Sequence, residues 1–158
     1  MKETFYSYIQ DLQDTITAKL EEIDGKSRFQ EDIWKRPEGG GGRTRVIQNG
    51  DVFEKGGVNI SDVHGELPKS MQTYFGVEDA DFFACGLSLV LHPTNPFVPT
   101  VHANWRYFEM YDEAGNIVTQ WFGGGQDLTP YYLFDEDAVH FHTVCKSACD
   151  KHHSDFYP

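Results

Sequence analysis

The stretch SLVLHPTNPFVPTVHANWRYFEMYDEAGNIVTQWFGGGQD, at residues 88–127, decides the fold of this chain. Together with the six residues that precede it, this stretch predicts three strands of an antiparallel sheet, at residues 82–91, 100–111 and 117–122. The proline-rich loop between the first two is too stiff to be a central strand. The sequence EAGN before the third strand is typical of a hairpin turn.

Polar side chains follow one face of two of these strands. Because side chains alternate between the faces of a strand, His102, Asn104 and Arg106 point to the same side. Ser88 and His92 share one face of the preceding strand. Such groups are costly to bury without partners. The face is therefore either the solvent-exposed side of an antiparallel sheet or the floor of a polar pocket, and this stretch alone leaves both open.

Length and composition narrow the class of protein. A chain of 158 residues predicts a single domain, and an aromatic content of 15% is not that of a disordered chain. An odd number of cysteines without a C-x-x-C motif favours a reducing compartment. No apolar run approaches the ~20 residues that span a bilayer, and the N-terminal residues do not resemble a signal peptide. We therefore expect a cytoplasmic protein with no membrane span.

The formal net charge of −12 argues against nucleic acid and anionic membranes as partners. It does not exclude a small anionic ligand. A planar arginine side chain pairs with a carboxylate through local geometry, whatever the charge of the whole protein.

Helices are expected at both ends of the chain. Apolar residues recur every three or four positions over residues 5–23, which predicts an amphipathic helix that ends at Gly25. A second helix is expected over residues 135–151, with Asp135 as its N-cap. One short helix is possible within residues 66–80. No folded element is expected over residues 152–158.

The segment between the first helix and the strands carries glycines, arginines and a turn. Asn49 and Gly50 between two β-like runs predict a hairpin. The four glycines at residues 39–42 allow a mobile loop or a close approach to a ligand, but the Lys-Ser/Thr element of a phosphate loop is missing. Arg43 and Arg45 would share a face if they lay on a strand, and a solvated strand end is the simpler interpretation.

Several blocks are similar to a known family. HPTNPFVPTVHANWRYFE, WFGGGQDLTPYY and EDAVHFH resemble the oxygen-dependent coproporphyrinogen III oxidases, as does WKRPEGGGGRTRVIQNGDVFEKGGVNISDVHG. Family chains are much longer, so residues 1–158 resemble the N-terminal half of such a domain. The resemblance implies an α+β fold with a large antiparallel β-sheet flanked by helices, and a homodimer for the full-length family.

The resemblance also implies an activity. The family converts coproporphyrinogen III to protoporphyrinogen IX in haem biosynthesis, by oxidative decarboxylation of the ring A and B propionates to vinyl groups. Oxygen is the co-substrate, no organic cofactor is involved, and a divalent metal cation is ascribed to some members. The alternative is a truncated, non-catalytic fragment that binds a porphyrin or porphyrinogen.

Site residues follow from the same alignment. His102 takes the position of the proton donor. Asp127 takes that of an aspartate that accepts hydrogen bonds from the pyrrole N–H groups. Arg106 is the best candidate to pair with a propionate. Ser88, Asn104, Trp105 and Arg106 align with substrate contacts. Since Trp105 faces away from His102, it would contribute through its backbone.

A metal site is the weakest expectation. His92 and His142 align with family metal ligands whose third partner lies beyond Pro158. His142, Cys145 and Cys149 share one face of the second helix, but their spacing matches no usual zinc motif. Cysteines packed in the interior are the simpler interpretation. A small metal-binding module that uses His92, His142 and Cys145 is the remaining alternative.

Overall fold

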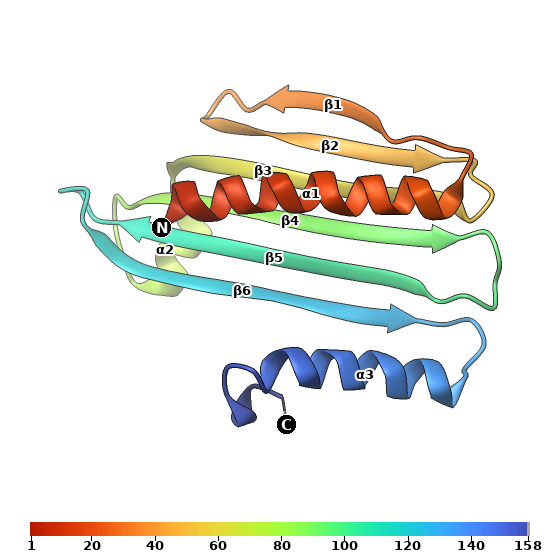
Figure 1. Ribbon diagram of the computed structural model, residues 1–158. Helices are drawn as coiled ribbons and strands as arrows, with labels where there is room; N and C mark the ends of the chain where they lie inside the picture. The colour runs from red at the N-terminus through yellow and green to blue at the C-terminus, as the bar shows by residue number, and fades with distance from the viewer. Residues whose placement is uncertain (158) are drawn as a thin grey trace.

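The computed structural model describes residues 1–157. One antiparallel sheet dominates the fold, and each strand pairs with the next along the chain, in the order β1-β2-β3-β4-β5-β6 (Figure 1). The elements are, in chain order, α1 (Lys2–Asp24), β1 (Gln30–Lys35), β2 (Gly40–Gln48), β3 (Phe53–Glu66), α2 (Lys69–Phe75), β4 (Asp81–Pro93), β5 (Thr100–Tyr111), β6 (Ile117–Thr129), α3 (Asp135–Cys149) and a 3₁₀ helix (Ser154–Phe156). The α+β fold with a large antiparallel sheet is confirmed.

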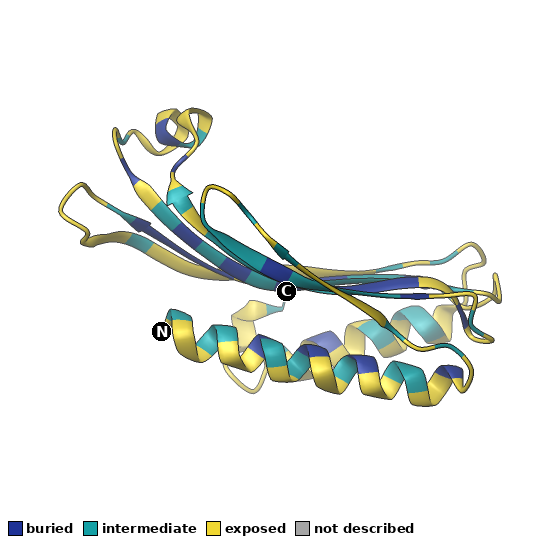
Figure 2. Ribbon diagram, turned by 90° about the horizontal axis from the view of Figure 1, so that it is seen from above, coloured by how far each residue is buried: buried dark blue, intermediate teal, exposed yellow. Residues whose placement is uncertain are grey.

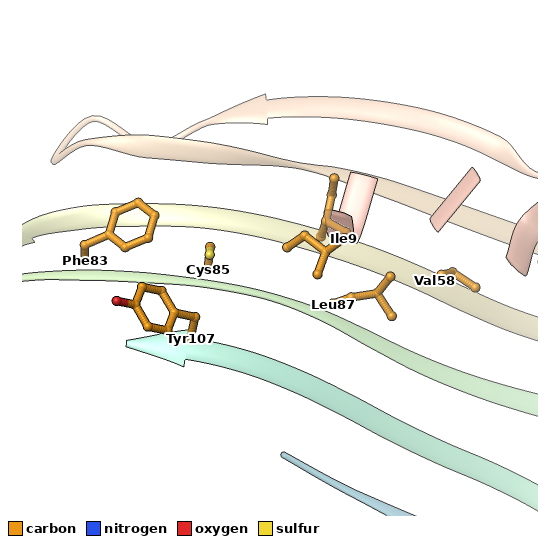
Figure 3. Close-up of a cluster of buried hydrophobic side chains, with 7 residues drawn as sticks. Ile9, Val58, Phe83, Cys85, Leu87 and Tyr107 are labelled. Carbon is orange, nitrogen blue, oxygen red and sulfur yellow. The ribbon is translucent and has the colours of Figure 1, made fainter. Parts of the chain in front are cut away.

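The two long helices lie on the same side of the curved sheet, and the short α2 lies on the other side at one end (Figure 2). We call these two sides the helix face and the open face. On the helix face, the fully buried Ile9 of α1 packs into a cluster on β3, β4 and β5 (Figure 3). Its buried members are Ile9, Val58, Ile60, Phe83, Cys85, Leu87 and Tyr107.

Polar contacts fix α1 over the start of the sheet. The buried Gln13 donates to the backbone carbonyls of Arg43 (2.9 Å) and Val58 (2.7 Å). Arg43 and Arg45 both reach Asp14 on the helix, at 2.8 and 2.7 Å. The two arginines share a face, as expected, but the interpretation as a solvated strand end is wrong. They lie under α1, where carboxylates neutralise them.

Asp24 ties the end of α1 to the β2–β3 hairpin. Its carboxylate accepts hydrogen bonds from the backbone N–H groups of Ser27 (2.8 Å), Val52 (3.0 Å) and Phe53 (3.0 Å). These bonds hold the pKa of the Asp24 carboxyl well below its usual range, and the bond from Phe53 has the largest effect. The hairpin falls at Asn49, whose φ of 56° is the left-handed value that such turns need. Both the hairpin and the helix end at Gly25 are confirmed.

A smaller apolar cluster closes one end of the open face. Leu67 and Ala80, on either side of α2, are buried with Phe108 and Met110 of β5. Phe108 also stacks on Phe82 and on Trp121 of β6, with ring centroids 6.3 and 5.1 Å apart. The rest of the open face carries no helix.

Three expectations about the C-terminal third of the chain are wrong. β6 runs on to Thr129, because the backbone of Gly123–Gly125 pairs with β5 and a strand needs no side chains for its ladder. Asp135 lies inside α3, whose N-cap is Phe134. A 3₁₀ helix forms near the end, where His153 Nδ1 accepts from the backbone N–H of Asp155. None of the helices in residues 1–157 is long and apolar enough to cross a membrane.

Asp24→Asn tests the anchor between α1 and the hairpin. We expect the free energy of unfolding at pH 7 to fall by about 2 kcal/mol, the usual size for hydrogen bonds to a charged group. Because the folded pKa is lowered, this stability is present above the unfolded value of about 3.9 and is lost as the pH falls through it toward the folded value. Urea denaturation at pH 7 and pH 3.5 should show the difference from wild type shrinking with acid. A difference independent of pH would contradict this assignment.

Candidate active site on the open sheet face

The strand register brings the polar residues of the open face into rows across the sheet. One row joins Thr44, Asn59, Ser88 and Asn104, and ends at Gly125 of β6. Residues paired across strands share a face and lie about 5 Å apart. The predicted sharing of one face by Ser88, His102, Asn104 and Arg106 is therefore confirmed, and the row extends to β2 and β3.

His102 and Asp127 form a hydrogen-bonded pair at the next row. They are paired across β5 and β6, and His102 Nδ1 lies 2.8 Å from Asp127 Oδ1. The hydroxyl of Thr129 donates to the same oxygen at 3.2 Å. The hydrogen bond from His102, and then that from Thr129, lower the pKa of Asp127. An ionised carboxylate requires the proton to sit on Nδ1 of His102, which leaves Nε2 free for proton exchange.

Arg106 differs from the other arginines in having no carboxylate partner. Arg28, Arg36, Arg43 and Arg45 each form an ion pair with aspartate or glutamate. Arg106 forms none within residues 1–157, and its side chain is exposed on the open face. In a chain of net charge −12, this leaves a positive group free to bind an anion.

A concavity of about 590 Å³ lies on the open face over β2 to β5. Polar residues of its lining are Thr44, Asn59, Ser61, Ser88 and Arg106. Trp34 borders it on the β1 side, and Phe82, Phe108 and Trp121 border it where α2 packs. The volume is typical of small-molecule sites. The His102–Asp127 pair stands on the same face beside the concavity and is not part of its lining.

Glycines on this face make room for the large side chains that lie along it. A Cβ at Gly42 would come within 2.4 Å of the Trp34 ring, and one at Gly86 within 3.0 Å of Arg106 Cγ. At Gly125, on β6, an added Cβ would meet nothing within 4 Å. The floor next to Asn104 is therefore open to a flat ligand.

Trp105 lies on the helix face, as its place in the alternation predicts. It is paired with Leu87 and Gly124, and its side chain is 38% exposed. It is thus separated from His102 and Arg106 by the thickness of the sheet. Any contact between this residue and a ligand on the open face would have to involve its backbone.

The proposed metal ligands are not brought together. His92 stands on the open face, with Nδ1 3.4 Å from the Thr100 hydroxyl. His142 belongs to α3 on the helix side and contacts the Tyr157 hydroxyl. Residues 1–157 contain no cluster of three ligating side chains. The residues present do not fit a metal, so neither the family-type site nor the metal-binding module is supported.

The three cysteines are free thiols, as the sequence suggested. Cys145 is buried under the sheet, where its sulfur accepts a hydrogen bond from Gln126 Nε2. Burial raises the pKa of Cys85 to about 12, which keeps that thiol protonated at neutral pH. The interpretation of Cys145 as a residue packed in the interior is confirmed.

Sequence reasoning missed the half of the site that lies on β2 and β3. Asn59 and Ser61 are two residues apart on one strand, so the same alternation would have placed them on one face. Their face could not be assigned without the register between β3 and β4. The tryptophan that borders the concavity, Trp34, gave no signal in the sequence.

Fold and site define an α+β protein whose antiparallel sheet carries a polar, concave face. A family model described as coproporphyrinogen III oxidase matches residues 4–158. A relative from Glycine max, oxygen-dependent coproporphyrinogen-III oxidase, chloroplastic, is 48% identical over 168 residues, which cover 100% of this chain and 44% of the relative. The chain belongs to the coproporphyrinogen III oxidase family. It spans less than half the length of the relative from Glycine max.

The comparison corrects the expected localisation. A cytoplasmic protein was expected, whereas the matching relative from Glycine max is named as chloroplastic. The expectation rested on the cysteine pattern and on the acidic N-terminal residues. Free thiols indicate a reducing environment, and they do not distinguish one reducing compartment from another.

His102→Ala tests the pair on β5 and β6. Because the hydrogen bond from His102 is the first cause of the lowered pKa of Asp127, we expect this pKa to rise toward the ordinary value in the variant. Carboxyl ¹³C titration by NMR would measure it. Asp112 is the matched control, since its lowered pKa comes from Asn116 and should not change. An unchanged titration of Asp127 would show that the pair does not form in solution.

Proposed function

We propose that the open face binds coproporphyrinogen III and supports its oxygen-dependent oxidative decarboxylation to protoporphyrinogen IX. One observation carries this proposal: the exposed, unpaired Arg106 shares a face with the hydrogen-bonded pair of His102 and Asp127. The name of the relative from Glycine max supports oxygen as co-substrate. Because this chain spans 44% of that relative, residues outside it would contribute to the complete site.

The ligand suits the charges and shape of the face. Coproporphyrinogen carries four propionates around a tetrapyrrole, so it needs cations or hydrogen-bond donors at its rim. Arg106 offers a planar fork to one carboxylate, and Ser88 and Asn104 offer neutral polar groups nearby. The concavity and the open floor at Gly125 give the macrocycle space along the sheet.

The His102–Asp127 pair fits the chemistry at the reacting side chain. Conversion of a propionate to a vinyl group releases carbon dioxide, one proton and two electrons, and oxygen accepts the electrons. Asp127 would use its second carboxylate oxygen to accept pyrrole N–H groups and stabilise positive charge on the ring. It also orients His102, whose Nε2 would exchange a proton with the substrate.

Assembly is a further prediction. Full-length members of this family are expected to be homodimers, and residues 1–158 are proposed to form the N-terminal half of one domain. The outer edge of β6 has no partner strand within residues 1–157, which leaves a place for further chain or for a second protomer.

Turnover tests the proposed function. The chain is incubated with freshly reduced coproporphyrinogen III in air or under argon, all tetrapyrroles are then oxidised chemically, and protoporphyrin is separated by chromatography. We expect protoporphyrin in air only. His102→Ala should slow its formation about 100-fold, as for loss of a general acid–base group. Asp127→Ala should abolish it, and Asp112→Ala in the exposed turn should not alter it.

The outcomes separate the two functions that the sequence left open. If the chain binds the tetrapyrrole but forms no protoporphyrin, the oxidase hypothesis fails and the hypothesis of a non-catalytic binding fragment takes its place. Normal turnover in His102→Ala would remove the role of His102 as proton donor.

Arg106→Ala tests the carboxylate anchor separately from the chemistry. Loss of a charged hydrogen bond should raise the Kd for coproporphyrin III by about tenfold or more. Quenching of tryptophan fluorescence would measure the Kd. Arg28→Ala is the control, because Arg28 is an exposed arginine paired with Glu21 at the end of α1. Equal affinities of the two variants would contradict the role of Arg106.

A further inference from the structure

The side-chain amide of Asn59 lacks hydrogen-bond partners. Within residues 1–157, Asn59 Oδ1 is enclosed by protein and makes no hydrogen bond. Buried polar groups in folded proteins are nearly always paired, so each exception needs a physical reason. The only other such atom in the same residues, Asp62 Oδ1, lies on the helix face of the same strand.

Asn59 lies in the middle of the polar row of the open face. It is paired with Thr44 on one side and Ser88 on the other, and it lines the concavity. A Cβ at Gly57 would lie 3.3 Å from Asn59 Nδ2, so glycine at that position leaves room for the amide. The hydroxyl of Thr44 already accepts from Trp34 Nε1, at 3.2 Å. The amide of Asn59 and the hydroxyl of Ser61 make no side-chain hydrogen bond within residues 1–157, and Asn59 is the one of the two that lies in the row of Ser88 and Asn104.

We propose that Asn59 is a ligand-positioning residue that donates Nδ2–H to a carboxylate of the bound tetrapyrrole, on the side away from Arg106. This inference rests on the proposed function and adds a second anchor to it. Oδ1 is enclosed by protein and Nδ2 is not, so Nδ2 is the atom of the amide that a ligand can reach. The two anchors stand two strands and one row apart, which corresponds to about 12 Å between Cα atoms. That separation suits carboxylates at opposite sides of one macrocycle.

Two substitutions distinguish this role from a structural one. Asn59→Ala removes the donor and should raise the Kd for coproporphyrin III about five- to tenfold, the equivalent of one hydrogen bond. Asn59→Asp keeps the shape but places a negative charge beside the carboxylate, and should weaken binding further. Asn59→Ala also removes an unpaired buried oxygen, so its Tm should equal or exceed that of wild type. A residue needed only for folding would lose stability together with affinity.

Asp62→Asn is the matched control. It alters the side chain that carries the other buried oxygen without a hydrogen bond on β3, on the opposite face of the sheet, and should leave the Kd within about twofold of wild type. The measurements are the Kd by tryptophan quenching and the Tm by circular dichroism, on the 158-residue chain.

The outcomes are separable from those of the proposed function. If wild type does not bind coproporphyrin III, the proposed function fails and this inference fails with it. If wild type binds and Asn59→Ala binds equally well, only the role of Asn59 is overturned. Tight binding by Asn59→Asp with weak binding by Asn59→Ala would mean that the residue accepts a hydrogen bond, and would overturn its assignment as donor. A fall in Tm that parallels the loss of affinity would also overturn it.

Discussion

The two-residue alternation of side chains across β3, β4 and β5 is the constraint on which this structure depends. It sends Val58, Ile60 and Leu87 to one face, where α1 covers them, and Asn59, Ser61 and Ser88 to the other. Burial of the apolar set drives the packing of the helix. The polar set is left uncovered because a second helix there would have to desolvate it. A one-residue change in register would exchange the two sets and destroy both the core and the site.

Local pairing of charges, more than net charge, decides what the open face can bind. The arginines at residues 43 and 45 are held by Asp14 and Glu31 beneath α1, so they serve the fold. Arg106 lies two residues from Asn104, and its partners on the neighbouring strands β4 and β6 are both glycines. No acidic residue within residues 1–157 forms an ion pair with it. The proposed binding of an anionic ligand is compatible with a strongly acidic protein, because a short-range bidentate contact outweighs a distant, screened repulsion.

Alternation and turn chemistry are local, and the sequence therefore predicted the elements that depend on them. The amphipathic helix ending at Gly25, the hairpin at Asn49 and the shared face of His102, Asn104 and Arg106 were all foreseen. The prediction failed where a neighbour supplies the stabilisation. Gly123–Gly125 have low strand propensity, and they continue β6 because β5 supplies their hydrogen bonds. The hydrogen bond between His102 and Asp127 joins residues far apart in the chain, and only the pairing of β5 with β6 brings them together.

The site also shows where stability and function oppose each other. A core position that held an unpaired amide oxygen would be improved by almost any apolar replacement, since the unpaired group lowers the stability of the folded state. The same amide at Asn59 stands at the wall of a concavity, between hydroxyl groups on both neighbouring strands. A carboxylate that accepts from Nδ2 would leave Oδ1 unpaired, so the cost of that oxygen to the stability of the fold remains whether or not a ligand is bound. The proposed role of Asn59 thus lies in binding alone. Ile9 and its neighbours on the other face contribute to stability whether or not a ligand is present.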